Sequence, residues 1–298
     1  MRPAPTGAAA ALEALAGPLV LLRARPASAA FLLVIVVLLT GLTQIGGLVL
    51  WLCVPVLRRL DRRLAGRGRA VRTLATAGLL AGAYALASLA AVPLAGSFGR
   101  VPLPCGQSGG ASLAALSPLT CVLNRHYATP AVRAELMRIA DRLATDFPGA
   151  RVSYLDAAFP FLDGVPLPPH LTHRDGRKVD IALFFVAPDS GRPLPGHAPS
   201  PIGYWGYVPP RPGEPAPCAG RDSWLRWDFA WLQPLLPESE LDAARTRALV
   251  QRLAASPRVV RIFLEPHLRQ RLAVLHPKVR FQGCAAARHD DHIHVSFR

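Results

Sequence analysis

Two long stretches of the chain contain no Lys, Arg, Asp or Glu: the residues between Arg25 and Arg58, and those between Arg72 and Arg100. A membrane-spanning helix needs about 20 apolar residues, and each stretch is longer than that. We therefore predict two transmembrane helices, near 30–54 and 73–95. The first would be one long tilted helix, because Gln44, Gly46 and Gly47 are expected to interrupt it only mildly. Two helices buried in a soluble core are the alternative, but such long charge-free runs are rare there.

The segment between the two predicted helices is strongly basic. It holds one acidic residue, Asp61, and seven arginines: Arg58, Arg59, Arg62, Arg63, Arg67, Arg69 and Arg72. Arg-rich loops beside transmembrane helices stay in the cytoplasm. We therefore predict that residues 1–99 are an anchor in the lipid bilayer of the cytoplasmic membrane, and that the chain after them lies on the periplasmic or extracellular side. Residues 1–99 carry +8 of the net charge of +15.

Other absences narrow the function of the exported part. It has no internal repeat and no basic patch interleaved with aromatic residues, so we expect no nucleic-acid partner. Its remaining charge of +7 favours an anionic partner such as cell wall or lipid head groups.

The exported part also has no Cys-x-x-Cys spacing, which disfavours a zinc–thiolate site. Its four cysteines are Cys105, Cys121, Cys218 and Cys284. We predict that they form two disulfides, with all three pairings open; Cys53 falls in the first predicted span.

The exported part mixes helical and strand patterns without regular alternation. Residues 100–129 are expected to be a linker and 130–298 a folded domain. We predict helices over 129–146 and 238–255, strands over 151–156, 179–186, 258–264 and 292–297, and a long Pro-rich loop over 188–222. Thr129 is the expected N-cap of the first helix, and Leu136, Ile139 and Leu143 form its apolar stripe. This pattern indicates an α+β domain with a largely antiparallel sheet.

Three of the nine histidines lie within six residues near the end of the chain, as His289-x-x-His292-x-His294. Residues two apart on a strand point to the same face, so His292 and His294 aim at one point. Upstream, His173 and Asp180 are separated by seven residues, with Gly176 available for a turn. Two histidines and a carboxylate are the ligand chemistry of a catalytic zinc.

We therefore predict that His173, Asp180 and His294 bind one Zn²⁺ per chain and leave a fourth position for water; Mn or Co is not excluded. Zinc lowers the pKa of its water to about 7. A peptidase must also move a proton from that water to the leaving amine. We assign His289 as the general base and His292 as the group that stabilises the oxyanion, although the two roles are interchangeable.

The remaining histidines are expected to be surface or structural residues: His126, His170, His197, His267 and His276. His170 is the first exception to consider, because it is close to His173 in the sequence. Asp290 and Asp291 are expected to be turn residues without a role. Tyr204, Trp205 and Tyr207 either form one wall of the cleft or anchor the 188–222 loop.

The two motifs resemble the signature of the penicillin-insensitive murein endopeptidases, which belong to the lysostaphin, D-Ala-D-Ala peptidase and hedgehog group of zinc folds. That group shows Ser-His-x-x-Gly-x-x-x-Asp followed by His-x-His. This chain reads Thr172-His173-Arg174-Asp175-Gly176-Arg177-Lys178-Val179-Asp180, and later His289-Asp290-Asp291-His292-Ile293-His294-Val295. Related D-Ala-D-Ala peptidases have Glu, their general base, at the position of His289. Thr172 in place of Ser, Ser296 in place of Arg, and the 188–222 segment depart from the pattern.

The resemblance covers roughly residues 130–298 and implies a zinc metallopeptidase that cleaves peptidoglycan cross-links or stems. The two predicted membrane spans are unlike the usual soluble periplasmic enzyme of the family, so we expect a membrane-anchored form. Two rivals remain open. A D-Ala-D-Ala carboxypeptidase or dipeptidase would need an Arg or Lys in the cleft to bind the terminal carboxylate. A non-catalytic zinc-containing envelope protein would keep its function after mutation of His289.

Overall fold

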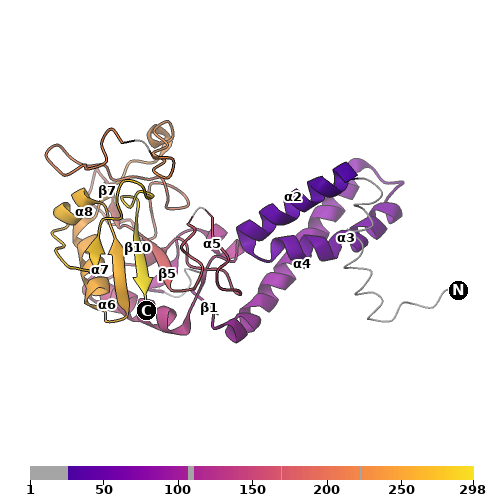
Figure 1. Ribbon diagram of the computed structural model, residues 1–298, viewed down its shortest axis with the longest axis horizontal. Coiled ribbons are helices and arrows are strands. Elements are labelled where there is room, and N and C mark those ends of the chain that lie inside the picture. Colours follow the sequence, from indigo (N-terminus) through magenta and orange to yellow (C-terminus); the bar gives the residue numbers. More distant parts are fainter. Residues whose placement is uncertain (1–25, 107–110, 169, 222) are drawn as a thin grey trace. The chain divides into compact units, whose positions relative to one another are not determined.

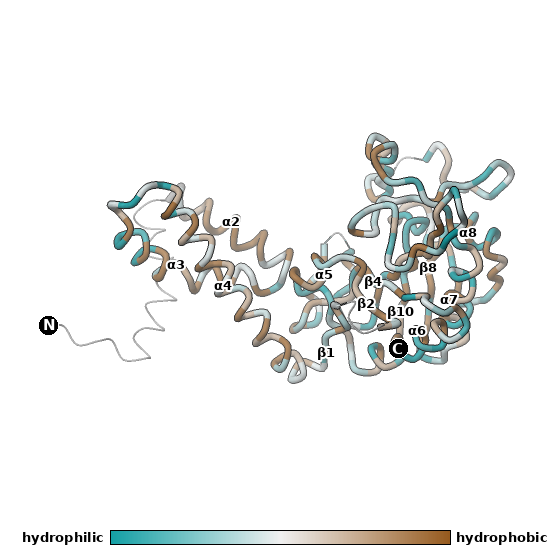
Figure 2. The backbone as a smooth tube through the Cα atoms, turned by 180° about the vertical axis from the view of Figure 1, so that it is seen from behind, coloured by the Kyte–Doolittle hydropathy of each residue, from teal (hydrophilic) through white to brown (hydrophobic). Residues whose placement is uncertain are grey.

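The computed structural model describes residues 26–106, 111–168, 170–221 and 223–298 (Figure 1). The chain divides between Ser97 and Phe98 into two compact units. From Pro26 onward, the N-terminal unit consists of helices α2 (Pro26–Thr43), α3 (Gly46–Arg63) and α4 (Arg69–Ala95), followed by the short 3₁₀ helix η1 (Gly96–Phe98) at its end. Apolar residues dominate α2 and most of α4, whereas the C-terminal unit is mixed (Figure 2).

The first predicted span, 30–54, is not one continuous helix. Gln44 adopts a left-handed backbone conformation with φ of 65°, which ends α2, and the chain folds back into α3. The side chain of Thr43 accepts a hydrogen bond from the backbone N–H of Gly46 at 2.8 Å, which satisfies one free donor at the start of α3. A Cβ on Gly47 would lie 2.2 Å from the carbonyl oxygen of Val36, so only glycine allows this close packing of α3 on α2. The prediction that these residues interrupt the helix mildly was wrong.

The second predicted span, 73–95, lies within a helical segment that is long and apolar enough to cross a membrane. This segment, Arg69–Phe98, is the one such helix in the described ranges, and little of it is buried. The structure also contains two disulfides, both in the C-terminal unit. A long apolar helix followed by disulfides is typical of a secreted or membrane-associated protein.

The C-terminal unit is built on a six-stranded sheet in the order β2-β4-β5-β10-β8-β9. The strands are β2 (Leu113–Ala115), β4 (Val152–Tyr154), β5 (Lys178–Ala182), β10 (His292–Phe297), β8 (Val259–Phe263) and β9 (Val279–Arg280). The four central strands are antiparallel, and each edge pair is parallel. The α+β class is confirmed, but the sheet is mixed, because short strands join both edges.

The segment expected as a linker, 100–129, contributes to this unit. It contains β1 (Val101–Pro102), the edge strand β2, α5 (Pro118–Val122) and β3 (Tyr127–Ala128), and β1 pairs with β3. The disulfide Cys105–Cys121 lies within it. The apolar residues of β2 are fully buried beside β4, which explains why the segment is ordered into the sheet and not extended.

The predicted helix over 129–146 is confirmed as α6 (Pro130–Asp146), with Thr129 as its N-cap. Its apolar stripe is buried in the core with α7 (Ala243–Ala255) and the sheet. Helix α7 starts later than predicted, because Glu240–Leu241 form β7, which pairs with β6 (Phe185–Val186). Strands β5 and β6 replace the single predicted strand over 179–186.

The described residues of the Pro-rich stretch 188–222 contain no helix and no strand, as predicted for a long loop. The loop continues to the short 3₁₀ helix η3 (Gln233–Leu235). The disulfide Cys218–Cys284 ties it to the segment that precedes β10. The four cysteines of the C-terminal unit therefore form two disulfides, and Cys53 in α3 is free.

Candidate metal centre

The register of two central strands brings two of the predicted ligands together. In the antiparallel pair β5–β10, Asp180 stands opposite His294. The Nδ1 atom of His294 lies 2.8 Å from Oδ1 of Asp180. Both side chains are buried, and the Asp180 side chain is fully so. Burying a charged carboxylate without a partner costs free energy. The Asp180 carboxylate therefore needs a positively charged partner nearby.

His173 reaches the same point from the turn before β5. Gly176 has φ of 67°, and a Cβ there would lie 2.6 Å from the guanidinium of Arg100, so the turn requires glycine. The Nδ1 of His173 hydrogen-bonds the carbonyl oxygen of Ala157 at 2.8 Å. Its Nε2 therefore points at the strands, 3.2 Å from both His294 Nδ1 and Asp180 Oδ1.

The three donor atoms fit a zinc ion. Zinc binds imidazole nitrogen and carboxylate oxygen at about 2.0–2.1 Å in a tetrahedron, whose ligand atoms are then about 3.3 Å apart. Here the three separations are 2.8, 3.2 and 3.2 Å. The contact from His173 Nδ1 to a backbone carbonyl is also the usual support for a metal-binding histidine. The predicted ligand set is thus brought together by the fold.

His170, which we expected to be structural, lies against the same carboxylate. Its Nδ1 is 2.7 Å from the second oxygen of Asp180, Oδ2. Its ring centroid is 5.6 Å from those of His173 and His292. The sequence had marked His170 as the first exception because it is close to His173, and His170-x-x-His173 has the same spacing as His289-x-x-His292.

Asp291 also has a role that sequence analysis missed. It accepts a hydrogen bond from Nδ1 of His292 at 2.5 Å and another from the backbone N–H of Trp205 at 2.7 Å. Nε2 of His292 is buried and, within the described residues, has no hydrogen-bond partner. Burial lowers the pKa of His292, but the Asp291 and Asp180 carboxylates outweigh it and raise the pKa to about 9.

Asp290 is not a free turn residue either. Its carboxylate pairs with the guanidinium of Arg288 at 2.7 and 3.0 Å. Its carbonyl oxygen accepts from the backbone N–H of Val208 at 2.8 Å. These contacts hold the segment before β10 against the long loop.

His289 lies at the edge of the cluster. Its ring centroid is 5.0 Å from that of His292 and 5.8 Å from that of His294. Burial lowers the pKa of His289 well below its ordinary value, and the neighbouring histidines add to this effect. Its backbone N–H donates to the carboxylate of Glu265 at 3.2 Å. The surroundings of His289 therefore favour the neutral imidazole.

A cleft of about 310 Å³ opens above these groups, and His289, His292 and His294 line it. Its aromatic lining residues are Tyr204, Trp205, Tyr207 and Trp227. Trp205 has φ of 66°, an uncommon conformation that its backbone contacts to Asp291 and Gln233 maintain. Tyr204 does more than line the wall: its hydroxyl lies 2.8 Å from Asp180 Oδ2 and 3.0 Å from Asp156 Oδ2.

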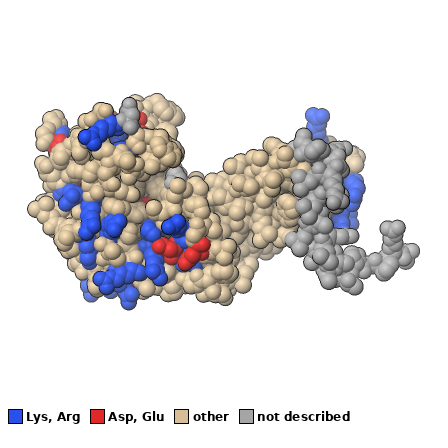
Figure 3. All heavy atoms as spheres, in the orientation of Figure 1, with Lys and Arg blue, Asp and Glu red and all other residues tan. Residues whose placement is uncertain are grey.

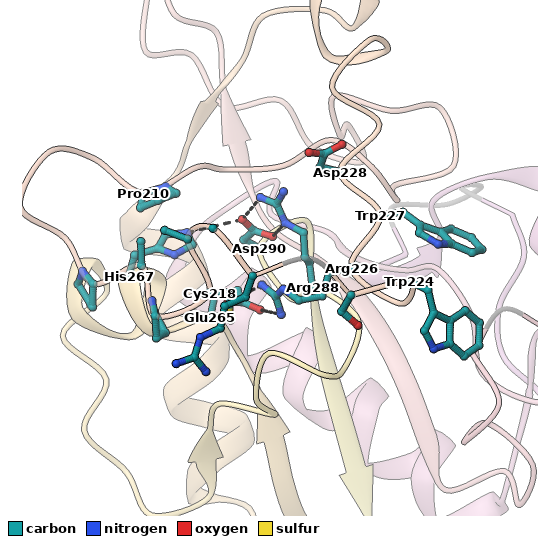
Figure 4. Close-up of a pocket in the computed structure, with 17 residues that line it drawn as sticks. Pro210, Cys218, Trp224, Arg226, Trp227, Asp228, Glu265, His267, Arg288 and Asp290 are labelled. Atoms are coloured by element: carbon teal, nitrogen blue, oxygen red, sulfur yellow. Dashed lines mark hydrogen bonds and ion pairs between the residues drawn. The ribbon is translucent and has the colours of Figure 1, made fainter.

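A larger cavity, of about 670 Å³, shares Arg288 and Trp227 with this cleft as lining residues. Figure 4 shows the guanidinium groups of Arg226 and Arg288 turned toward the carboxylates of Glu265 and Asp290. These charges satisfy one another, and none of the predicted metal ligands lines this cavity. Over the visible face of the C-terminal unit, Lys and Arg side chains are spread widely beside a small acidic group (Figure 3).

The other histidines behave as structural residues. His126 is buried against the ring of Tyr127, and burial lowers its pKa to about 4. His126 also lies near Cys105 and Cys121, but those thiols are joined in a disulfide. His267 bonds the carbonyl oxygen of Val208 at 2.8 Å. His276 is half-buried, and its Nδ1 accepts from the backbone of Lys278.

No protein-family model matches the chain, and no curated protein matches it. The residues of the site therefore carry the functional argument.

Proposed function

We propose that this protein is a zinc-dependent peptidase that hydrolyses peptide bonds in peptidoglycan. The observation that carries the proposal is the convergence of His173 Nε2, Asp180 Oδ1 and His294 Nδ1, within 3.2 Å of one another beneath an open cleft. The resemblance of the two motifs to murein endopeptidases supplies the substrate class and the expected zinc fold.

Bound zinc would supply a nucleophile from water near neutral pH and would polarise the substrate carbonyl. The side chains of the chain divide the remaining work. His289, buried and neutral, accepts a proton and later delivers it to the leaving amine. The orphan Nε2 of His292 faces the site and is able to hydrogen-bond the oxygen of the scissile carbonyl, while Asp291 fixes its ring.

One contact favours an endopeptidase over a carboxypeptidase. Arg288 is the only Arg or Lys among the described residues that line the cleft. Its guanidinium is already paired with Asp290 and lies over the ring of Tyr207, 3.9 Å from the centroid. It is therefore not available to bind a terminal carboxylate. The cleft suits the interior of a peptide.

The location of the enzyme follows from the same features. We propose that α4 spans the cytoplasmic membrane with the Arg-rich segment 58–72 inside. The C-terminal unit then lies in the periplasmic or extracellular space, where its two disulfides are stable. Peptidoglycan is present in that space.

The test uses the full-length protein, purified in detergent and incubated with cross-linked muropeptides. We expect cross-linked dimers to disappear, a chelator to stop the reaction and zinc to restore it. Mass spectrometry of the products identifies the bond. The matched control is His276→Ala, a half-buried histidine outside the cleft, which should leave activity unchanged. Release of terminal D-Ala alone would replace the endopeptidase by a carboxypeptidase. No product from folded, zinc-loaded protein would favour a non-catalytic envelope protein.

A further inference from the structure

The two oxygens of Asp180 face different histidines. Oδ1 lies 2.8 Å from His294 and 3.2 Å from His173, the donor set described above. Oδ2 faces away from that pair and lies 2.7 Å from Nδ1 of His170. The Tyr204 hydroxyl also lies 2.8 Å from Oδ2. A carboxylate with an imidazole nitrogen beside each oxygen is arranged to bridge two cations.

His292 completes a second set. Its Nε2 lies 3.8 Å from Asp180 Oδ1, too far for a hydrogen bond, and its ring centroid is 5.6 Å from that of His170. The ligand atoms of His170, Asp180 and His292 all lie within 4.8 Å of one another. This spacing is able to close around one ion.

The supporting contacts of His292 are those of a metal ligand. Its Nδ1 is bonded to the Asp291 carboxylate, which the backbone N–H of Trp205 holds in turn. Metal-binding histidines almost always use their second nitrogen in this way. The other nitrogen, Nε2, is buried without a partner in the described chain, and a buried polar atom normally has one.

We propose that His170, Asp180 and His292 form a second divalent-metal site, and that Asp180 is shared with the site of His173 and His294. Two imidazoles and a carboxylate suit Zn²⁺, Co²⁺ or Mn²⁺. Two-metal sites hold their ions about 3.5–4 Å apart, which a shared carboxylate allows. The inference rests on the first metal site of the proposed function, but not on peptidase activity or on peptidoglycan as the substrate. It changes one role given there: a His292 Nε2 that binds the second ion does not hydrogen-bond the scissile carbonyl, and the second ion would stabilise that oxygen instead.

The competing explanation is that His170 only orients Asp180 by a hydrogen bond and that a single metal is bound. The number of metal ions bound per chain distinguishes these two explanations. The full-length protein in detergent is stripped with chelator, loaded with Zn²⁺, desalted and measured by mass spectrometry. We expect about two zinc ions per chain in the wild type, one in His170→Ala and two in the control His276→Ala. Retention of one ion in His170→Ala shows that the first site is intact.

A spectroscopic measurement tests the sharing of Asp180. Mn²⁺ is titrated into the stripped protein and followed by electron paramagnetic resonance. We expect the second equivalent to produce a spin-coupled pair, and His170→Ala to give only the uncoupled signal of one ion. One ion per chain in the wild type, an unchanged count in His170→Ala, or two uncoupled ions would each overturn the proposal. These outcomes do not depend on turnover, so the peptidase proposal stands or fails separately.

Discussion

His294 on β10 stands opposite Asp180 on β5, and Nδ1 of His294 lies 2.8 Å from Oδ1 of Asp180. The two side chains are positioned by neighbouring central strands, whose backbone hydrogen bonds fix the register. A slip of one residue would turn one of them to the opposite face of the sheet. The sheet therefore holds this pair in place without any bound ion, whereas His170, His173 and His289 lie outside the strands.

Asp180→Asn tests the central ligand. The amide keeps the shape of the carboxylate but removes its charge, so we expect metal affinity to fall by at least about 100-fold, more than for typical supporting contacts. Competition against a chromophoric chelator measures the affinity. Asp175→Asn is the matched control, because Asp175 lies in the turn just before β5 but pairs with Lys178 and not with the histidines. Equal affinities for wild type and Asp180→Asn would rule out this metal site.

His289→Gln separates catalysis from binding. His289 is not among the proposed ligands of either site, so the variant should retain the wild-type metal content. We expect turnover of muropeptides to fall by about 10²–10⁴-fold, the usual contribution of general acid–base catalysis. Quantitative product analysis at fixed enzyme concentration measures the loss. An unchanged rate would remove His289 from the mechanism.

Tyr204→Phe removes a hydroxyl that lies within hydrogen-bond distance of both Asp180 and Asp156. Because that hydroxyl holds a ligand carboxylate in place, we expect a loss of about 10–100-fold in metal affinity or activity, with the fold retained. Tyr207→Phe is the matched control, since Tyr207 lines the same cleft but its hydroxyl bonds the backbone of Trp227. An equal loss in Tyr204→Phe and Tyr207→Phe would mean that the hydroxyls act through the wall of the cleft and not through the Asp180 carboxylate.

The sequence predicted the parts of the site that depend on local periodicity. Alternation along β10 places His292 and His294 together, and the turn at Gly176 lies between His173 and Asp180. The predictions failed where a contact depends on tertiary packing. The support of His292 by Asp291 requires the backbone of Trp205, far away in the sequence. No periodic pattern encodes such a contact.

The fold shows the same limit. The α6 helix and β10 were predictable because capping, apolar spacing and alternation agree. The break at Gln44 was not, because a left-handed residue carries no hydropathy signal, and the adjacent glycines show their role only when α3 packs against Val36. The parallel strands at the sheet edges, two or three residues long, are too short for alternation to identify.

Acid should loosen the loop near residue 214. Hydrogen bonds from the Arg271 guanidinium lower the pKa of Glu214 to about 2. The pKa of a free Glu in the unfolded chain is about 4.3. Because the pKa is lower in the folded state, the carboxylate stabilises the fold fully above pH 4.3, and this contribution is lost as the pH falls toward 2. We expect Glu214→Gln to lose about 1 kcal/mol at neutral pH, as for a partly exposed ion pair, and to respond less to acid in this range. Thermal melts followed by tryptophan fluorescence measure both effects, with the exposed Glu238→Gln as control. Parallel acid responses of wild type and Glu214→Gln would contradict the assignment.

The Cys218–Cys284 disulfide should affect the cleft more than the Cys105–Cys121 disulfide does. It closes a chain separation of 66 residues, against 16 for the other. Loop-closure entropy assigns roughly 4 and 3 kcal/mol of stability to the two, so their removal should cost similar amounts. The two disulfides differ mainly in where they lie. Cys218–Cys284 joins the loop that carries Trp205 and Trp227 to the segment that carries Ala286 and His289, and these four residues line the cleft.

We therefore expect Cys218→Ser/Cys284→Ser to raise the KM for muropeptides several-fold with metal content unchanged, and Cys105→Ser/Cys121→Ser to leave KM near the wild-type value. Both variants should be assayed at a temperature where each is fully folded by its melting curve, so that stability does not enter the comparison. Equal KM values in the two variants would show that the strong backbone and side-chain contacts of Asp290 and Asp291 hold the cleft without the covalent link.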